Sequence, residues 1–158
     1  MNILNEKLSS LPRFLRALAQ TSGQLCNYTE LGGQVGLDSK TAAKYLGIFE
    51  HMYLLKRVDV WARNRLNRVI KTPKLHFIDS GLLSALLDLT AEEVQQNRSR
   101  FGNVLETFVF GELYKHISTA DGDYRLMYYR DVEKVEVDVV IENTAGYVVG
   151  IEIKSSAT

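Results

Sequence analysis

The spacing of apolar residues changes near residue 52, and this change constrains the fold more than any other feature of the sequence. Over residues 11–52 the spacing is helical, and Gly23 and Gly36 interrupt it, which predicts three successive helices. Over residues 53–78 apolar and polar residues alternate in two short runs, as is typical of strands. The N-terminal half is therefore expected to consist of three helices followed by a basic two-stranded hairpin.

That order of elements is typical of a winged helix-turn-helix unit, in which the third helix enters the major groove of DNA. On this hypothesis the third helix presents Lys40, Thr41 and Lys44 to the bases and the hairpin tip presents Arg63, Arg65 and Arg68 to phosphates. The alternative is that the unit only packs against another domain. The sequence leaves both possibilities open.

A second unit is predicted after a short helix that Asp79 or Ser80 begins and a polar stretch at 88–101. It comprises one helix followed by three strands, over residues 102–117, 124–130, 135–142 and 147–154. We therefore predict an α+β chain with a winged helix-turn-helix at 1–90 and a second, incomplete α/β unit at 91–158.

Charge is distributed unevenly along a chain whose formal net charge is zero. Seven Lys and Arg face one acid between His51 and Leu75, whereas ten acids face five bases from Gly102 onward. A basic middle suits phosphate and an acidic end suits a divalent cation, although either run can also be a solvated face. The single cysteine, Cys26, excludes an internal disulfide and favours a cytoplasmic protein, and no apolar run is long enough to span a membrane.

The most informative residues of the second unit are three acids and a lysine. Glu106 lies on the predicted helix, Asp138 on a strand, and Glu152 and Lys154 on one face of the next strand. A short turn at 143–146 makes these strands antiparallel neighbours, which brings Asp138 toward Glu152. Carboxylates gathered in this way bind Mg²⁺ or Mn²⁺, and such a metal activates water for attack on a phosphodiester.

The order helix-Glu, strand-Asp, strand-Glu-x-Lys resembles the PD-(D/E)XK nuclease superfamily. That resemblance implies Asp138, Glu152 and Lys154 as catalytic residues, with Glu106, Asp138 and Glu152 as ligands of Mg²⁺ or Mn²⁺. Two departures stand against it. Val137 replaces the proline that gives the motif its name, and the helix and strand expected after Glu-x-Lys are missing. A degenerate nuclease fold that is kept for binding is the alternative.

A longer stretch carries a second resemblance. SGQLCNYTELGGQVGLDSKTAAKYLGIFEHMYLLKRV, followed by KTPKLHFIDSGLLSALL, resembles a domain of unknown function that follows the ATPase module of many prokaryotic AAA-type ATPases. The resemblance implies that this chain is a fragment whose ATPase module lies upstream, because the chain has no GxxxxGK[ST] phosphate loop. ATP would then bind only to that module.

Three functions compete at this point. The first is a DNA-associated module of the ATPase with a nuclease-like magnesium site. The second is a DNA-binding module whose acidic residues are structural. The third is a docking domain for the ATPase or another protein, with a homo-oligomer as a further possibility, and the acidic C-terminal half favours it because acidic surfaces repel DNA.

Overall fold

A computed structural model describes residues 3–64 and 72–155, with side chains from Ser10 onward. The described residues form two three-stranded antiparallel sheets with helices around them, which confirms a mixed α+β chain. The elements are α1 (Ile3–Ala19), β1 (Gln24–Leu25), α2 (Tyr28–Gln34), α3 (Ser39–His51), β2 (Leu55–Val58), β3 (Lys74–Phe77), α5 (Ser80–Leu86), α6 (Ala91–Gln96), η1 (Arg98–Phe101), α7 (Gly102–Thr119), β4 (Tyr124–Arg130), β5 (Glu136–Asn143) and β6 (Val148–Ile151).

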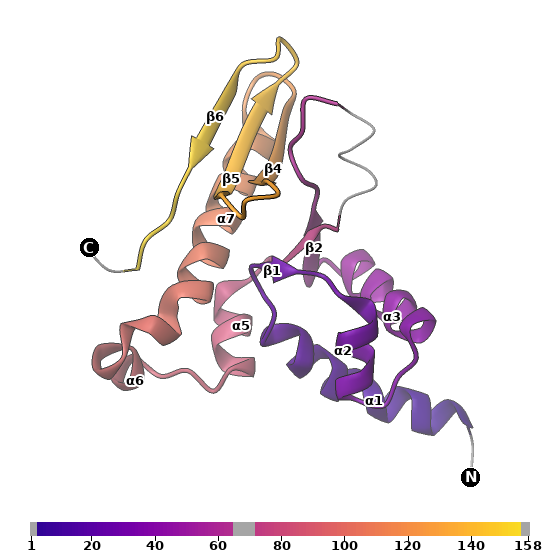
Figure 1. The fold of residues 1–158 in the computed structure, drawn as a ribbon. Helices are drawn as coiled ribbons and strands as arrows, with labels where there is room; N and C mark the ends of the chain where they lie inside the picture. The colour runs from indigo at the N-terminus through magenta and orange to yellow at the C-terminus, as the bar shows by residue number, and fades with distance from the viewer. Residues whose placement is uncertain (1–2, 65–71, 156–158) are drawn as a thin grey trace.

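The N-terminal unit combines α1, α2 and α3 with a sheet of strand order β1-β3-β2 (Figure 1). Asn27 and Asp38 begin α2 and α3, since each side chain accepts two backbone N–H groups of the first turn. The predicted apolar stripe of α3 is buried against Phe14 and Leu18 of α1. The first helix differs from its prediction because it begins at Ile3, which places Pro12 inside the helix instead of in its first turn.

The stretch at 88–101, predicted as a polar joint, is instead largely helical. Thr90 and Glu93 form a reciprocal capping box that begins α6, because each side chain accepts the backbone N–H of the other residue. Asn97 then begins the 3-10 helix η1, which runs directly into α7. Local capping therefore produces structure here without an apolar stripe.

The C-terminal unit places α7 behind a sheet of strand order β4-β5-β6 (Figure 1). The antiparallel pairing of β5 and β6 confirms the predicted hairpin. However, β6 ends at Ile151, so Glu152 and Lys154 lie beyond the strand and the prediction of a strand to 154 was wrong. The Asp138 carboxylate accepts the backbone N–H of Ile153 at 2.7 Å. Beyond the end of β6, a side chain of β5 thus replaces the backbone as the hydrogen-bond partner of this segment.

The two units are joined by backbone as well as side chains. Val60 forms a parallel bridge with Tyr128, and the N–H of Trp61 donates to the Tyr128 carbonyl at 2.6 Å. The segment after β2 thus extends along β4. Gly111 lets α7 approach the first unit closely, since a Cβ there would lie 3.2 Å from the Ile78 carbonyl oxygen. No helix in the described part of the chain is long and apolar enough to cross a membrane.

Candidate functional site: a buried lysine among carboxylates

The joint between the units contains a lysine that is almost fully buried. The side chain of Lys74, on β3, is 3% exposed, and its Nζ lies 3.2 Å from Glu106 Oε1 and 2.5 Å from Glu136 Oε1. Asp138 Oδ1 is 4.0 Å away, and the ring of Tyr128 lies beneath the ammonium at 5.5 Å from its centroid. We call Lys74, Glu106, Glu136 and Asp138 the ion cluster.

The ion cluster combines side chains from three elements, β3, α7 and β5. Glu136 and Asp138 are two residues apart on β5 and therefore share one face of the sheet. Glu106 projects from the first half of α7 and packs beside Gly23. A Cβ added at Gly23 would lie 3.1 Å from the Oε2 atom of Glu106. Lys74 comes from the N-terminal unit, so the cluster forms only when both units are in contact.

His76 lies on the same face of β3 as Lys74 and is also buried. Its ring stacks on Phe110 of α7, with centroids 4.4 Å apart, and its Nδ1 lies 3.5 Å from the Thr107 hydroxyl. Its Nε2 has no hydrogen-bond partner among the described residues and lies 3.7 Å from Glu106 Oε1. Burial, aided by the charge of Lys74, lowers the pKa of His76 to about 3, so the imidazole is neutral at physiological pH.

The electrostatics of the ion cluster favour a charged lysine. Burial alone would lower the pKa of Lys74, but the hydrogen bond to Glu136 and the charge of Glu106 outweigh it, and the pKa is raised. The pKa of Glu106 is also raised, by burial and by the charges of Asp138 and Glu136, against the opposing attraction of Lys74. Burial is the largest cause of the raised pKa of Glu106, and the attraction of the Lys74 ammonium, which other carboxylates share, does not offset it.

The structure brings together only part of the predicted acidic site. Glu106 and Asp138 meet around Lys74, as two members of the predicted ligand set. Glu152 is 59% exposed and forms an ion pair with Lys154, which is 63% exposed. Glu152 thus turns to solvent, although the adjacent Ile153 N–H is bonded to Asp138.

A metal ion does not fit this arrangement. Within residues 3–64 and 72–155, no group of three or more His, Cys, Asp and Glu side chains could hold one. The predicted ligands Glu106 and Asp138 have the Lys74 ammonium between them, and Glu152 is directed elsewhere. The arrangement is an ion cluster at the contact between the two units.

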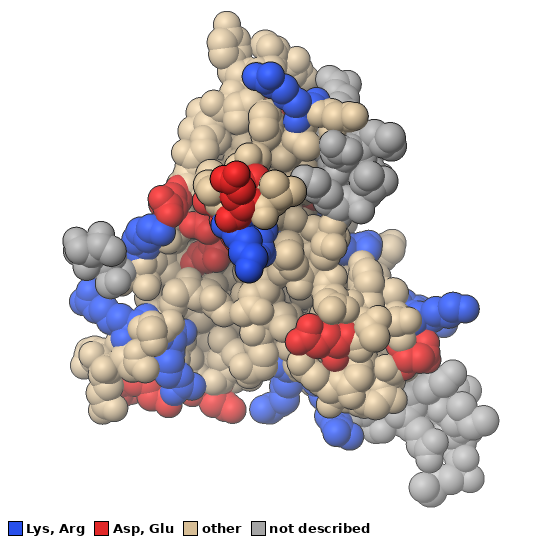
Figure 2. Space-filling model, viewed as in Figure 1, with Lys and Arg blue, Asp and Glu red and all other residues tan. Residues whose placement is uncertain are grey.

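Of the predicted DNA-contacting residues that the structure describes, Lys40, Lys44 and Arg63 are exposed and Thr41 is partly buried. Lys40 and Lys44 lie on the solvent face of α3, whereas the Thr41 hydroxyl donates to Asp38 at 2.6 Å as part of the helix cap. Arg63 is exposed, and Arg65 and Arg68 lie outside the described residues. On the face drawn in Figure 2, acidic and basic side chains are interspersed instead of forming one broad patch.

A hollow lies beside Lys40, where the start of α3 meets the start of α2 and the end of the β2–β3 connection. It has a volume of about 780 Å³, and its lining includes Thr29, Lys40, Thr72 and Pro73. Lys40 and the residues at the base of the hairpin therefore line the same recess, so one ligand could contact both.

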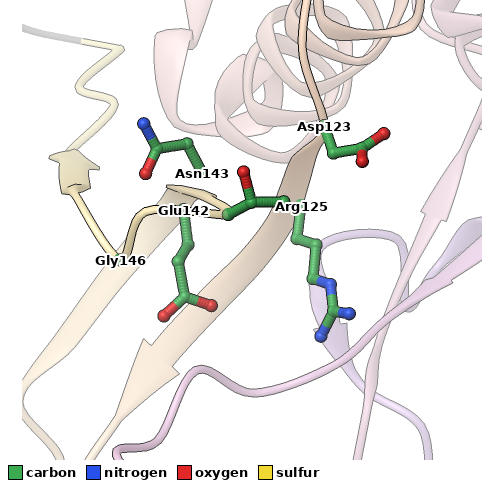
Figure 3. A pocket seen from close by; sticks show the side chains of 6 residues that line it. Asp123, Arg125, Glu142, Asn143 and Gly146 are labelled. Carbon is green, nitrogen blue, oxygen red and sulfur yellow. The ribbon is translucent and has the colours of Figure 1, made fainter.

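Another hollow, of about 330 Å³, lies at the turn end of the second sheet (Figure 3). Arg125 and Glu142 face each other across β4 and β5, and both side chains extend to the same side of the sheet. Glu142 also accepts the indole N–H of Trp61 at 3.3 Å, so it helps to attach the segment after β2 to this sheet. This hollow contains no member of the ion cluster.

Sequence analysis missed Lys74, Glu136 and His76 as site residues. Lys74 belongs to a basic run that favours an exposed surface, and Glu136 is most simply a solvated residue near a turn, yet Lys74 is buried and ion-paired with Glu136. One signal was available: KLHF places a charge and an imidazole in a strand that is buried on both faces. Polar side chains at such positions need partners.

Together, the described residues define a mixed α+β protein with an ion cluster at the contact between two units. Residues 3–93 match the model of a domain of unknown function, DUF8612, and the chain belongs to that family. Residues 101–158 match a second domain of unknown function, DUF4143.

The chain is similar to two uncharacterised mycobacterial proteins, Rv2008c of Mycobacterium tuberculosis and Mb2031c of Mycobacterium bovis. Each is 27% identical over 150 residues, which cover 95% of this chain and 33% of the relative. The chain thus spans about a third of the length of these curated relatives. No solved structure matches it.

Proposed function

We propose that this chain is a DNA-associated module of an AAA-type ATPase, with a winged helix-turn-helix as its DNA-binding unit. The helix order and the strand order β1-β3-β2 support the winged-helix assignment. The observation that carries the proposal is the position of Lys40 and Lys44. They are exposed on α3, and Lys40 borders the same hollow as Thr72 and Pro73 at the base of the hairpin.

The proposed association with an ATPase has separate support. DUF4143 is a domain found in AAA-ATPase-associated proteins. The relatives are about three times as long as this chain, which leaves room for an ATPase module in them. ATP would bind to that module and not to this chain.

The DNA proposal is tested by fluorescence anisotropy with a labelled duplex at a series of salt concentrations. The variant K40A/K44A removes two cations from α3, whereas R98A/K115A removes two exposed cations from elsewhere. If both lysines contact phosphate, K40A/K44A lowers the slope of log affinity against log salt by about 1.8, and R98A/K115A leaves it unchanged. Equal slopes in all three proteins, or no binding at low salt, would reject the DNA proposal.

A metal-dependent nuclease is a second candidate, which the position of Asp138 favours. Asp138 sits on β5 beside the segment that carries Glu152 and Lys154, as the PD-(D/E)XK order requires. Mg²⁺ or Mn²⁺ binding by Glu106, Asp138 and Glu152 would need Lys74 to leave the ion cluster and Glu152 to turn inward. The test is plasmid nicking by the full-length protein with either metal, which should disappear in D138N and K154A. Absence of cleavage by the full-length protein would exclude the enzyme.

A further inference from the structure

A further hollow, of about 410 Å³, lies between the two units, where β2 meets α7 and β4. We call it the interunit hollow. Val58 and Phe110 at its floor belong to a small buried core cluster. Tyr114 and Leu126 pack against that cluster and extend the apolar surface. A volume of about 300–1,000 Å³ and a mostly apolar lining are typical of sites for small organic molecules. No member of the ion cluster lines this hollow.

Two basic side chains, one from each unit, line the interunit hollow. Lys56 comes from β2 and Arg125 from β4, and within residues 3–64 and 72–155 neither forms an ion pair with a carboxylate. The Lys56 ammonium instead lies over the ring of Tyr114, 5.4 Å from its centroid. Glu142, opposite Arg125 on β5, accepts the indole N–H of Trp61. Both cations therefore remain available to an anion from solution.

The other charges of the lining do not cancel these two cations. Arg57 also lines the hollow, but it is ion-paired with Glu50 at 2.5 Å. Asp59 is the one acid among the described residues of the lining. Cations that outnumber acids above an apolar floor complement an organic anion, because the floor accepts an apolar body and the cations accept its charge.

We propose that the interunit hollow binds a small organic anion with an apolar body, such as an aromatic carboxylate or sulfonate. Its charged group contacts Lys56 and Arg125, and its apolar body lies against Tyr114 and Leu126. Because the two cations come from different units, the bound anion strengthens the contact between the units. This goes beyond the proposed DNA association, because it requires neither DNA binding nor cleavage.

The experiment is a fluorescence titration of the full chain with anilinonaphthalene sulfonate, an aromatic anion that fluoresces in apolar surroundings. Wild type should bind it saturably, and K56Q/R125Q should bind it roughly tenfold more weakly, since each contact to a charged group contributes to affinity. R98Q/K154Q is the matched control: it removes an exposed arginine and an exposed lysine outside the hollow and should titrate like wild type.

Competition experiments separate the contributions of charge and apolar body. Naphthalene sulfonate should displace the fluorescent probe. Naphthalenemethanol, which lacks the charge, and inorganic sulfate, which lacks the apolar body, should displace it far less. If naphthalenemethanol competes as well as naphthalene sulfonate, the two cations take no part in binding and the proposal is wrong.

Two further variants test where the probe binds. I117W adds bulk to the lining of the hollow at a partly buried position and should abolish binding. V149S changes a side chain of β6 that is 59% exposed and lies outside the hollow, so it should leave the titration unchanged. Because a ligand of the folded chain raises the melting temperature, the probe should stabilise wild type and V149S more than K56Q/R125Q. Undiminished binding in K56Q/R125Q, or loss of binding in V149S, would overturn the proposal.

Discussion

The imidazole of His76 lies flat against the phenyl ring of Phe110, with centroids 4.4 Å apart and ring planes at 10°. Stacking on an apolar ring, inside a region that excludes water, removes the solvation that a charged imidazole needs. Lys74 on the same face of β3 adds a like charge, while Glu106 at 3.7 Å is the nearest acid. His76 therefore remains neutral at pH values between about 3 and 6.5, at which an ordinary histidine would bind a proton.

This neutrality predicts a loss of stability in mild acid. The unfolded chain binds a proton near pH 6.5 but the folded chain only near pH 3, so folding stability falls as the pH drops below 6.5. Between pH 7.5 and 5.5 this histidine should cost about 1.4 kcal/mol of unfolding free energy. Urea denaturation of wild type and H76F at both pH values measures the difference. H116Q, which changes an exposed histidine of α7, should retain the wild-type dependence.

Alanine substitutions at the two glycines of α2, Gly32 and Gly33, should change stability in opposite directions. A Cβ at Gly32 would lie 2.6 Å from the backbone oxygen of Leu37, so the turn between α2 and α3 would have to shift. We expect G32A to lose about 1–3 kcal/mol of stability. At Gly33 nothing lies within 4 Å of the added atom. G33A should therefore gain about 0.5 kcal/mol from its helix propensity. Equal effects in thermal unfolding would contradict the close contact at Gly32.

Much of the N-terminal fold was predictable because its signals are local. Asn27 and Asp38 begin helices by hydrogen bonds within their own first turns, and the stripe of α3 has a helical period. The start of α1 was missed because Pro12 is also accepted inside this helix, where it costs one backbone hydrogen bond. The strand β1 was missed because it has only two residues, which are too few to show the alternation of apolar and polar side chains typical of a strand.

The ion cluster was only partly predictable, since it depends on contacts between distant segments. Glu106 and Asp138 were singled out by their positions on a predicted helix and a predicted strand, and both are cluster members. Lys74 is 32 residues from Glu106 in the sequence and further still from Asp138, and it reaches both across a contact between the units that no local pattern describes. Glu152 was expected beside Asp138 from strand alternation, but β6 ends before it and the alternation no longer applies.

Tyr128 contributes to the contact between the units, and its removal should lower the free energy of unfolding. Its hydroxyl donates to the Thr72 carbonyl at 2.5 Å, and its ring is 3% exposed beneath Lys74. Y128F removes this partly buried hydrogen bond with little change of shape and should cost about 1 kcal/mol, because the Thr72 carbonyl loses its donor. Y124F, at a tyrosine that is 40% exposed, is the control and should change the unfolding free energy little. A Y128F protein as stable as wild type would show that Thr72 finds another donor.

Glu106 predicts a pH dependence of opposite sign to that of His76. Its pKa is raised, chiefly by burial, so the folded chain holds its proton more tightly than the unfolded chain does. The stabilisation from that proton is present below pH 4.5 and is lost as the pH rises through the raised pKa. E106Q is neutral at every pH and avoids this loss, so its stability relative to wild type should increase from pH 4 to pH 7 in urea denaturation. E112Q, at a more exposed acid of α7, should show no such increase. A relative stability of E106Q that falls over this range would mean that the attraction of Lys74 exceeds the cost of burying the carboxylate.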